Sequence, residues 1–176
     1  VAIFGRESRL GASMGSITGI LLAFAVQWSH PDYPPVKVNR SELRNSEVSL
    51  GIRFPEDYKA EILAVGLPNP TLALLSAIVD RESDLHDLAE LSAPNAIVAE
   101  TTAWRKIGFP QNLIVIGHDS MGNKFCFDIA DLQGDTVSSA PVYFWDHNFG
   151  TLELVGDSFP DWIGNYVGEW STGLTY

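Results

Sequence analysis

The clearest periodic pattern of apolar residues lies in the second half of the chain, between residues 113 and 129. Leu113 to Ile116 is a short unbroken run of apolar, largely β-branched residues, which is typical of a strand covered on both faces. Gly117 to Asn123 is rich in residues that tolerate close turns. From Phe125 to Ile129 every second residue is large and apolar, which is the period of a half-buried strand. The pattern predicts a central β-hairpin whose turn reaches solvent.

A second hairpin and a closing helix follow. Val142 to Trp145 reads as a strand, Asp146 to Gly150 as a turn and Thr151 to Val155 as the returning strand. A capping box begins at Ser158, and the apolar positions from Phe159 to Trp170 then recur at helical spacing. We therefore expect an amphipathic helix that packs on the sheet.

The first half of the chain carries helix signals. Asn39 and Glu42 have the spacing of a capping box and predict a short helix that Gly51 ends. A second helix is expected to start at Pro55, a residue that the first helical turn accepts, and to stop at Gly66.

The segment between these helices and the central hairpin is harder to interpret. Leu72 to Val79 is apolar and fits a strand or a helix equally well. Asp84 to Leu91 has helical spacing, Pro94 predicts a break, and Ala99 to Ile107 predicts a short helix. Helices followed by an antiparallel meander and a closing helix indicate a single α+β domain, with a mostly antiparallel sheet flanked by helices.

Residues 1–35 differ from the rest and are treated as an N-terminal extension to a domain at 36–176. No charged residue occurs between Arg9 and Asp32, and Ile17 to Trp28 is mostly apolar. Three interpretations remain open: an element packed on the domain, a targeting segment, or upstream sequence that is not part of the natural protein. The segment is short for a membrane span, and we expect no membrane association.

The charge balance restricts the class of partner. The chain has 22 acidic and 11 basic residues and a formal charge of −11 at pH 7. This charge repels phosphate backbones and anionic lipid, so nucleic-acid binding is not expected, whereas a basic protein partner would be attracted. Cys126 is the single cysteine and lies in a predicted strand, which indicates a buried, inert thiol. We expect a cytoplasmic protein.

No sequence motif assigns an enzymatic activity. Phosphate-binding glycine loops, nucleophile elbows and HExxH helices are absent from the sequence. His118 and His147 lie on predicted turns beside Asp119 and Asp146, and a metal site would require the two turns to meet. We assign no catalytic residue, no metal ligand and no cofactor, and a metal-dependent hydrolase is the least favoured hypothesis.

Several short motifs occur together in a fixed order between residues 36 and 170. They are Leu43-x-x-x-Glu47-x-x-Leu50-Gly51, Phe54-Pro55-x-Asp57-Tyr58, Trp104, Pro110-x-Asn112-Leu113-x-x-Ile116-Gly117, Gly122-Asn123-x-Phe125-Cys126-Phe127-Asp128, Pro141-Val142-Tyr143-Phe144-Trp145-Asp146-His147 and Ser158-Phe159-x-x-Trp162. With this set the chain resembles the SUKH superfamily, in its branch related to the fungal cell-wall-assembly regulator. The resemblance implies an α+β domain with a non-enzymatic role. Bacterial members look like immunity proteins that neutralise a cognate toxin, often a nuclease, and fungal members are regulatory interaction proteins.

We therefore predict a protein-binding domain of the immunity type, with a regulatory scaffold protein as the alternative. Its acidic surface would steer a basic toxin, and a few aromatic residues would hold the toxin. The predicted contact residues share an expected position on the turn and loop side of the meander; they are Asp119, Asp128, Asp131, Trp145, Asp146 and His147.

Overall fold

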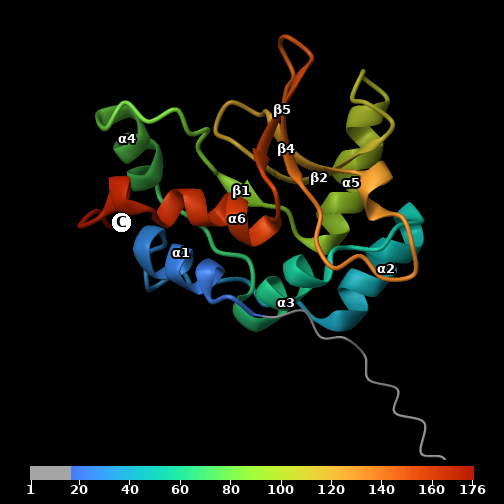
Figure 1. The fold of residues 1–176 in the computed structure, drawn as a ribbon, viewed down its shortest axis with the longest axis horizontal. Helices are drawn as coiled ribbons and strands as arrows, with labels where there is room; N and C mark the ends of the chain where they lie inside the picture. The colour runs from blue at the N-terminus through green and yellow to red at the C-terminus, as the bar shows by residue number, and fades with distance from the viewer. Residues whose placement is uncertain (1–16) are drawn as a thin grey trace, which may run out of the picture.

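The computed structural model describes residues 17–176, and in it a five-stranded antiparallel sheet lies between helices (Figure 1). The predicted α+β fold is confirmed. The strands follow one another across the sheet in chain order, as β1 (Glu90–Leu91), β2 (Leu113–His118), β3 (Lys124–Asp128), β4 (Val142–Asp146) and β5 (Thr151–Gly156). The central hairpin of β2 and β3 is confirmed, and β5 forms one edge of the sheet.

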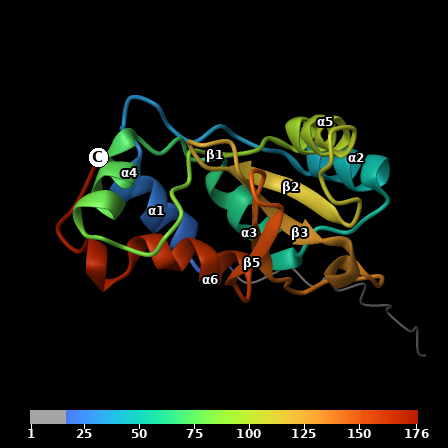
Figure 2. The same cartoon turned by 90° about the horizontal axis from the view of Figure 1, so that it is seen from above.

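Helices cover both faces of the sheet. The α-helices are α1 (Ile20–Trp28), α2 (Arg40–Leu50), α3 (Glu56–Val65), α4 (Leu72–Asp80), α5 (Pro94–Arg105) and α6 (Phe159–Gly164). Short 3-10 helices are η1 (Ile129–Leu132), η2 (Asn165–Val167) and η3 (Glu169–Ser171). Seen from above, α2 and α5 lie on one side of the sheet, and α1, α3 and α6 lie on the other (Figure 2). The larger hydrophobic core includes side chains of α1, α3 and α6, and also Leu43 of α2 and Ile97 of α5.

Local signals place the helices of the first half as predicted. The Asn39 side chain accepts a hydrogen bond from the Glu42 amide at 3.0 Å, and the Glu42 carboxylate accepts one from the Asn39 amide at 2.8 Å. The capping box of α2 is therefore confirmed. Gly66 ends α3 with φ 97°, and a Cβ there would lie 2.6 Å from the Val36 carbonyl oxygen, so only glycine fits.

The predicted helix from Asp84 to Leu91 is wrong. That segment runs extended, and its end pairs with β2 as β1. The His86 ring stacks on Phe144 at 3.6 Å between centroids, and the Ala89 amide donates to the His118 carbonyl at 2.9 Å. These tertiary contacts outweigh the helical spacing of Leu85 and Leu88.

Two further points concern the helices on either side of that segment. The apolar stretch from Leu72, for which strand and helix were both open, is helix α4, and Thr71 caps its first turn. Pro94 does not break the chain but occupies the first turn of α5, where its missing N–H is not needed. The predicted helix carrying Trp104 therefore begins earlier than expected.

The closing helix is shorter than predicted. α6 stops at Gly164 and continues as η2 and η3. A continued α-helix would need the Asn165 and Tyr166 carbonyls as acceptors for later amides. The Trp170 indole donates to the Asn165 carbonyl at 2.7 Å, and the Trp28 indole donates to the Tyr166 carbonyl at 3.0 Å. Indole groups therefore take the acceptors that the helix would have used.

α1 is part of the hydrophobic core. Its side chains Leu21, Phe24 and Trp28 are fully buried. The buried Glu61 carboxylate of α3 accepts hydrogen bonds from the amides of Gly19 and Leu21, both at 3.2 Å, and so caps the N-terminus of α1. The part of the predicted extension from residue 1 to 16 lies outside the described residues. Within residues 17–176, no helix combines the length and the apolar character that crossing a bilayer requires.

Candidate functional site

The hairpin of β4 and β5 projects from the body of the molecule (Figure 1). Both predicted strands are confirmed. Their turn is built by Asp146, whose Oδ1 accepts hydrogen bonds from the amides of Asn148 at 2.8 Å and Phe149 at 3.1 Å. Gly150 closes the turn with φ 66°. An aspartate that binds the backbone two and three residues ahead is a strong local turn signal, and it fixes the register of the hairpin.

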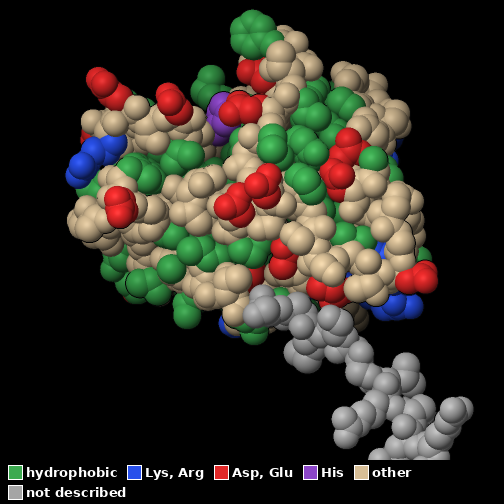
Figure 3. All heavy atoms as spheres, in the orientation of Figure 1, with side chains coloured by type: hydrophobic (Ala, Val, Ile, Leu, Met, Phe, Trp, Pro, Cys, Tyr) green, Lys and Arg blue, Asp and Glu red, His purple; other side chains and the backbone are tan. Residues whose placement is uncertain are grey.

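The two faces of this hairpin have different surroundings. On one face Phe144 is 4% exposed and belongs to the large core. On the other face the register pairs Tyr143 with Leu154 and Trp145 with Leu152. We call these four residues the β4–β5 face. Leu152 is 46% exposed and Leu154 is 53% exposed, and hydrophobic side chains gather over β4 and β5 with acidic groups beside them (Figure 3).

A small second hydrophobic cluster packs against the β4–β5 face, and Trp145 belongs to both. Trp145 is 6% exposed, and its ring lies 5.0 Å from that of Phe109 and 6.0 Å from that of Trp104, both in edge-on geometry. The Lys124 ammonium lies 4.5 Å from the centre of the Trp104 ring. Cys126 is buried in the same cluster, and burial raises the pKa of its thiol well above the ordinary value, which confirms the predicted buried thiol. Trp145 is therefore packed into this cluster and contributes little exposed surface to the β4–β5 face.

Two acidic residues border the other end of the β4–β5 face. The Tyr143 hydroxyl donates to Asp131 Oδ2 at 3.2 Å. Burial, followed by the negative charge of Asp131, raises the pKa of Tyr143. Asp128 accepts from the Ala130 amide at 2.9 Å and from the Asn112 side chain at 2.8 Å, so its carboxylate also caps η1. Asp128 therefore accepts a backbone hydrogen bond at the end of its strand.

The residues of the two hairpin turns hold those turns together. Asp119 is 5% exposed and accepts hydrogen bonds from the Met121 amide and from both the amide and the side chain of Asn123, at 2.8 to 2.9 Å. The Asn123 side-chain oxygen contacts the His147 amide at 3.1 Å and His147 Nδ1 at 2.8 Å. The chain Asp119–Asn123–His147 therefore joins the β2–β3 turn to the β4–β5 turn.

The six predicted contact residues do not form one patch. They fall into two groups: at the end of β3 that adjoins the hairpin turns (Asp119, Trp145, Asp146 and His147), where Trp145 pairs with Lys124, and at and beyond its other end (Asp128 and Asp131). Strand residues advance by about 3.3 Å each, so the five residues of β3 separate the groups by roughly 15 Å. The expectation that all six share one side of the meander is wrong, because the β3–β4 connection leaves from the end opposite to the two turns.

The turns do meet, as a metal site at His118 and His147 would require, but their side chains have other contacts. His118 Nδ1 lies 3.0 Å from the Asp119 carbonyl oxygen, and His118 Nε2 lies 3.6 Å from a Glu90 carboxylate oxygen. His147 binds Asn123. Within residues 17–176, no group of three or more His, Cys, Asp and Glu side chains is placed to hold a metal ion.

The leucines of β5 are the residues that sequence reasoning missed. Leu152 and Leu154 flank Glu153 in a strand predicted correctly, but a strand pattern alone does not tell which face is covered. Phe149 at the hairpin tip is 82% exposed, and Met121 in the neighbouring turn is 73% exposed. The sequence signal that could have found them was the alternation of apolar residues from Leu152 to Leu154 directly after a turn.

Comparison with known proteins assigns a family to the chain. Residues 37–165, which include the β4–β5 face, match the model of the SMI1 / KNR4 family (SUKH-1). No curated protein matches the chain. The match covers more than half of the sequence. Domains of this family are protein-interaction domains. The chain belongs to the SMI1 / KNR4 family (SUKH-1).

Proposed function

We propose that this domain is a non-enzymatic immunity protein, which neutralises a basic toxin domain in the cytoplasm by covering its active surface. The observation that carries the proposal is the β4–β5 face, where Leu152 and Leu154 are exposed beside Tyr143. Exposed apolar side chains that lie next to one another are typical of interaction sites, and a tyrosine with a polar tip is a common anchor in such sites.

Charge supports a basic partner. The chain carries a formal charge of −11, and Asp128 and Asp131 border the β4–β5 face. A negative surface around an apolar centre raises the rate at which a positively charged protein binds in the correct orientation. Domains that cleave nucleic acids carry positive surfaces, and such domains therefore fit this chemistry.

The polar groups near the face support binding rather than chemistry. Asp119, Asp146 and Asn123 use their side-chain oxygens to hold backbone amides of the turns. Such contacts make the hairpin rigid, and a rigid surface loses less conformational entropy when a partner binds.

Co-expression with the toxin-like products of adjacent genes tests the proposal. The wild-type chain is expected to restore growth against one of them, and the double variant Leu152→Lys/Leu154→Lys is expected to lose that effect and to bind at least tenfold more weakly. Val48→Lys is the matched control, because Val48 is 72% exposed on α2, away from the hairpin. Failure of the wild type to restore growth against every such neighbour contradicts the immunity role, and full activity of the double variant contradicts the face. A regulatory interaction protein is the alternative, and a neighbourhood without a toxin gene favours it.

A further inference from the structure

β5 is an edge strand with little protection against pairing. Within residues 17–176 it pairs with β4 alone, and its far end is marked by the Asn165 side chain, which donates to the Val155 carbonyl at 3.1 Å. Edge strands are usually protected by lysine, proline or a covering element. The segment from Thr151 to Val155 has neither lysine nor proline, and its first four residues are exposed. The register irregularity of the β4–β5 pair lies only at the far end of the strand, between the positions opposite Val142 and Tyr143. Its backbone is therefore available to a further strand.

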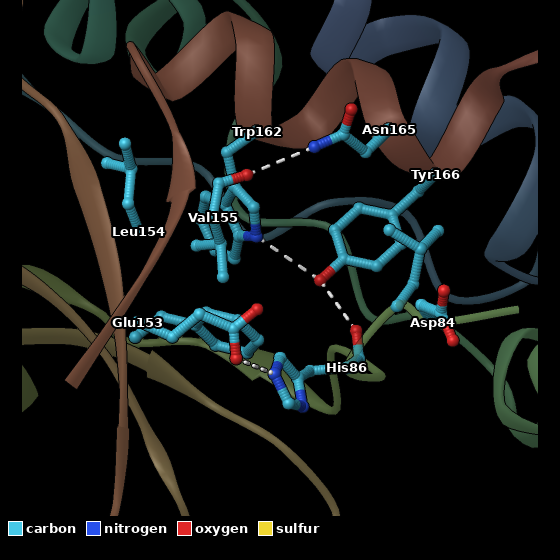
Figure 4. Close-up of a pocket in the computed structure, with 10 residues that line it drawn as sticks. Asp84, His86, Glu153, Leu154, Val155, Trp162, Asn165 and Tyr166 are labelled. Atoms are coloured by element: carbon cyan, nitrogen blue, oxygen red, sulfur yellow. Dashed lines mark hydrogen bonds and ion pairs between the residues drawn. The ribbon is translucent and has the colours of Figure 1, made fainter. Parts of the chain in front are cut away.

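A cavity of about 140 Å³ lies directly beside this strand. Ten residues line it, six of which carry the argument: Asp84, His86, Phe125, Glu153, Trp162 and Tyr166. The polar atoms of its aromatic walls already have partners, because the Trp162 indole donates to the Tyr166 hydroxyl at 3.2 Å and that hydroxyl donates to the His86 carbonyl at 2.9 Å (Figure 4). A dry cavity of about 150 Å³ is known to hold a benzene molecule, so this one has room for the stem of one side chain.

The charges around the cavity favour a basic side chain. Asp84 and Glu153 lie on opposite sides of it (Figure 4), and the Glu153 side chain is 61% exposed while it pairs with His86 Nε2 at 2.9 Å. Aromatic walls accept the methylene stem of lysine or arginine, and carboxylates at the rim bind its charged head. Neither an acidic side chain nor a neutral polar one would gain as much.

We propose that β5 binds an extended, basic segment of the partner as a sixth strand of the sheet, with one lysine or arginine side chain in the cavity. Backbone hydrogen bonds along the edge would supply affinity, and the cavity would select the side chain. This inference rests on the proposed function and specifies how the partner is held. A second copy of this chain is the less suitable occupant, because both copies carry a charge of −11 and the register centred on Glu153 would bring two Glu153 carboxylates together.

The experiment uses the full chain and a seven-residue peptide in which arginine alternates with valine. Saturating peptide is expected to slow amide hydrogen exchange at least tenfold at alternate residues of β5, measured by NMR. Glu153→Lys is expected to weaken peptide binding at least tenfold, and Glu153→Gln is expected to weaken it less. Asp135→Lys is the matched control, since it makes the same charge change in an exposed loop and is expected to alter binding less than twofold.

The possible results separate this inference from the proposed function. A peptide that fails to bind, or equal losses for Glu153→Lys and Asp135→Lys, overturns the edge-strand mode. β5 amides that are already protected in a dimer of the free chain, measured by light scattering and exchange, also overturn it, because a second copy then occupies the edge. If a toxin binds and growth is restored while the β5 amides stay unprotected, this inference fails and the proposed function stands.

Discussion

Two regions of the molecule are rich in aromatic and aliphatic residues. One consists of the two ends of the described chain, whose apolar side chains pack on each other, and we call it the closed region. The other is the β4–β5 hairpin, which leaves apolar side chains exposed. α1 and the residues after 165 lie outside the part that matches the family, and they pack on each other. The Trp28 indole donates to the Tyr166 carbonyl at 3.0 Å and stacks on Trp170 at 6.2 Å between centroids. Gln27 donates to the carbonyls of Ser171 and Leu174. This region completes the core.

The β4–β5 hairpin shows the opposite arrangement. Its inner face packs into the same core through Phe144, whereas Leu152 and Leu154 on its outer face remain exposed. α5 packs over β2 and leaves these two leucines uncovered. From this difference we expect substitutions in the closed region to change stability, and we expect substitutions on the open face to leave stability nearly unchanged and to act on the proposed partner binding.

The largest expected effect is in α1. Phe24→Ala should lower the free energy of unfolding by about 4 kcal/mol, because Phe24 is fully buried and packs edge-on against Tyr166. Leu22→Ala in the same helix should cost less than about 0.5 kcal/mol, since Leu22 is 55% exposed. Urea unfolding followed by tryptophan fluorescence measures both. Equal costs for the two variants would show that α1 is not packed as described.

The carboxylate that caps α1 should have the next largest effect. Glu61→Ala is expected to lower the free energy of unfolding by about 3 kcal/mol, because it leaves the part-buried Gly19 amide and the buried Leu21 amide without an acceptor. Asp135→Ala is the control: it removes the same charge from an exposed loop and should change stability by less than about 0.5 kcal/mol. The same unfolding measurement applies, and a cost below about 1 kcal/mol for Glu61→Ala would mean that water replaces it as the cap.

Some local features of the fold could be predicted from the sequence alone. The signals that rest on neighbouring residues were read correctly, such as the capping box at Asn39, the stop at Gly66 and the turn at Asp146. Each of them depends on a side chain that binds backbone two to four residues away or on a required φ, and both are visible in the sequence.

The errors arose where distant residues decide the structure. His86 stacks on Phe144, nearly sixty positions later, and this contact keeps its segment extended although the leucines have helical spacing. Turn positions and charge predict the candidate contact residues, but Asp119 is buried by its own turn. The exposed leucines of β5 were missed because only the order of strands shows that β5 is an edge.

A smaller effect of opposite sign is expected for Tyr58 of α3, which lies in the same hydrophobic core. Its hydroxyl is buried without a hydrogen-bond partner among the described residues, and burial raises the pKa of Tyr58. Tyr58→Phe should raise the free energy of unfolding by about 1 kcal/mol, because the ring contacts with Phe127 and Phe159 remain while an unpaired polar group is removed. Tyr33→Phe, at a residue that is 69% exposed, serves as the control and should change nothing measurable. A loss of stability in Tyr58→Phe would show that the hydroxyl has a partner after all.

The smallest effect on stability is expected on the open face. Leu154→Thr should change the free energy of unfolding by less than about 0.5 kcal/mol, because the side chain is 53% exposed and threonine suits a strand. Phe144→Ala, on the inner face of the same hairpin, should cost about 4 kcal/mol. Both variants leave the turn unchanged. The ratio of the two changes in the free energy of unfolding therefore measures how much more the inner face is buried than the outer face. A cost for Leu154→Thr above about 1.5 kcal/mol would mean that Leu154 is packed in the free protein, and the β4–β5 face could then no longer be regarded as open to a partner.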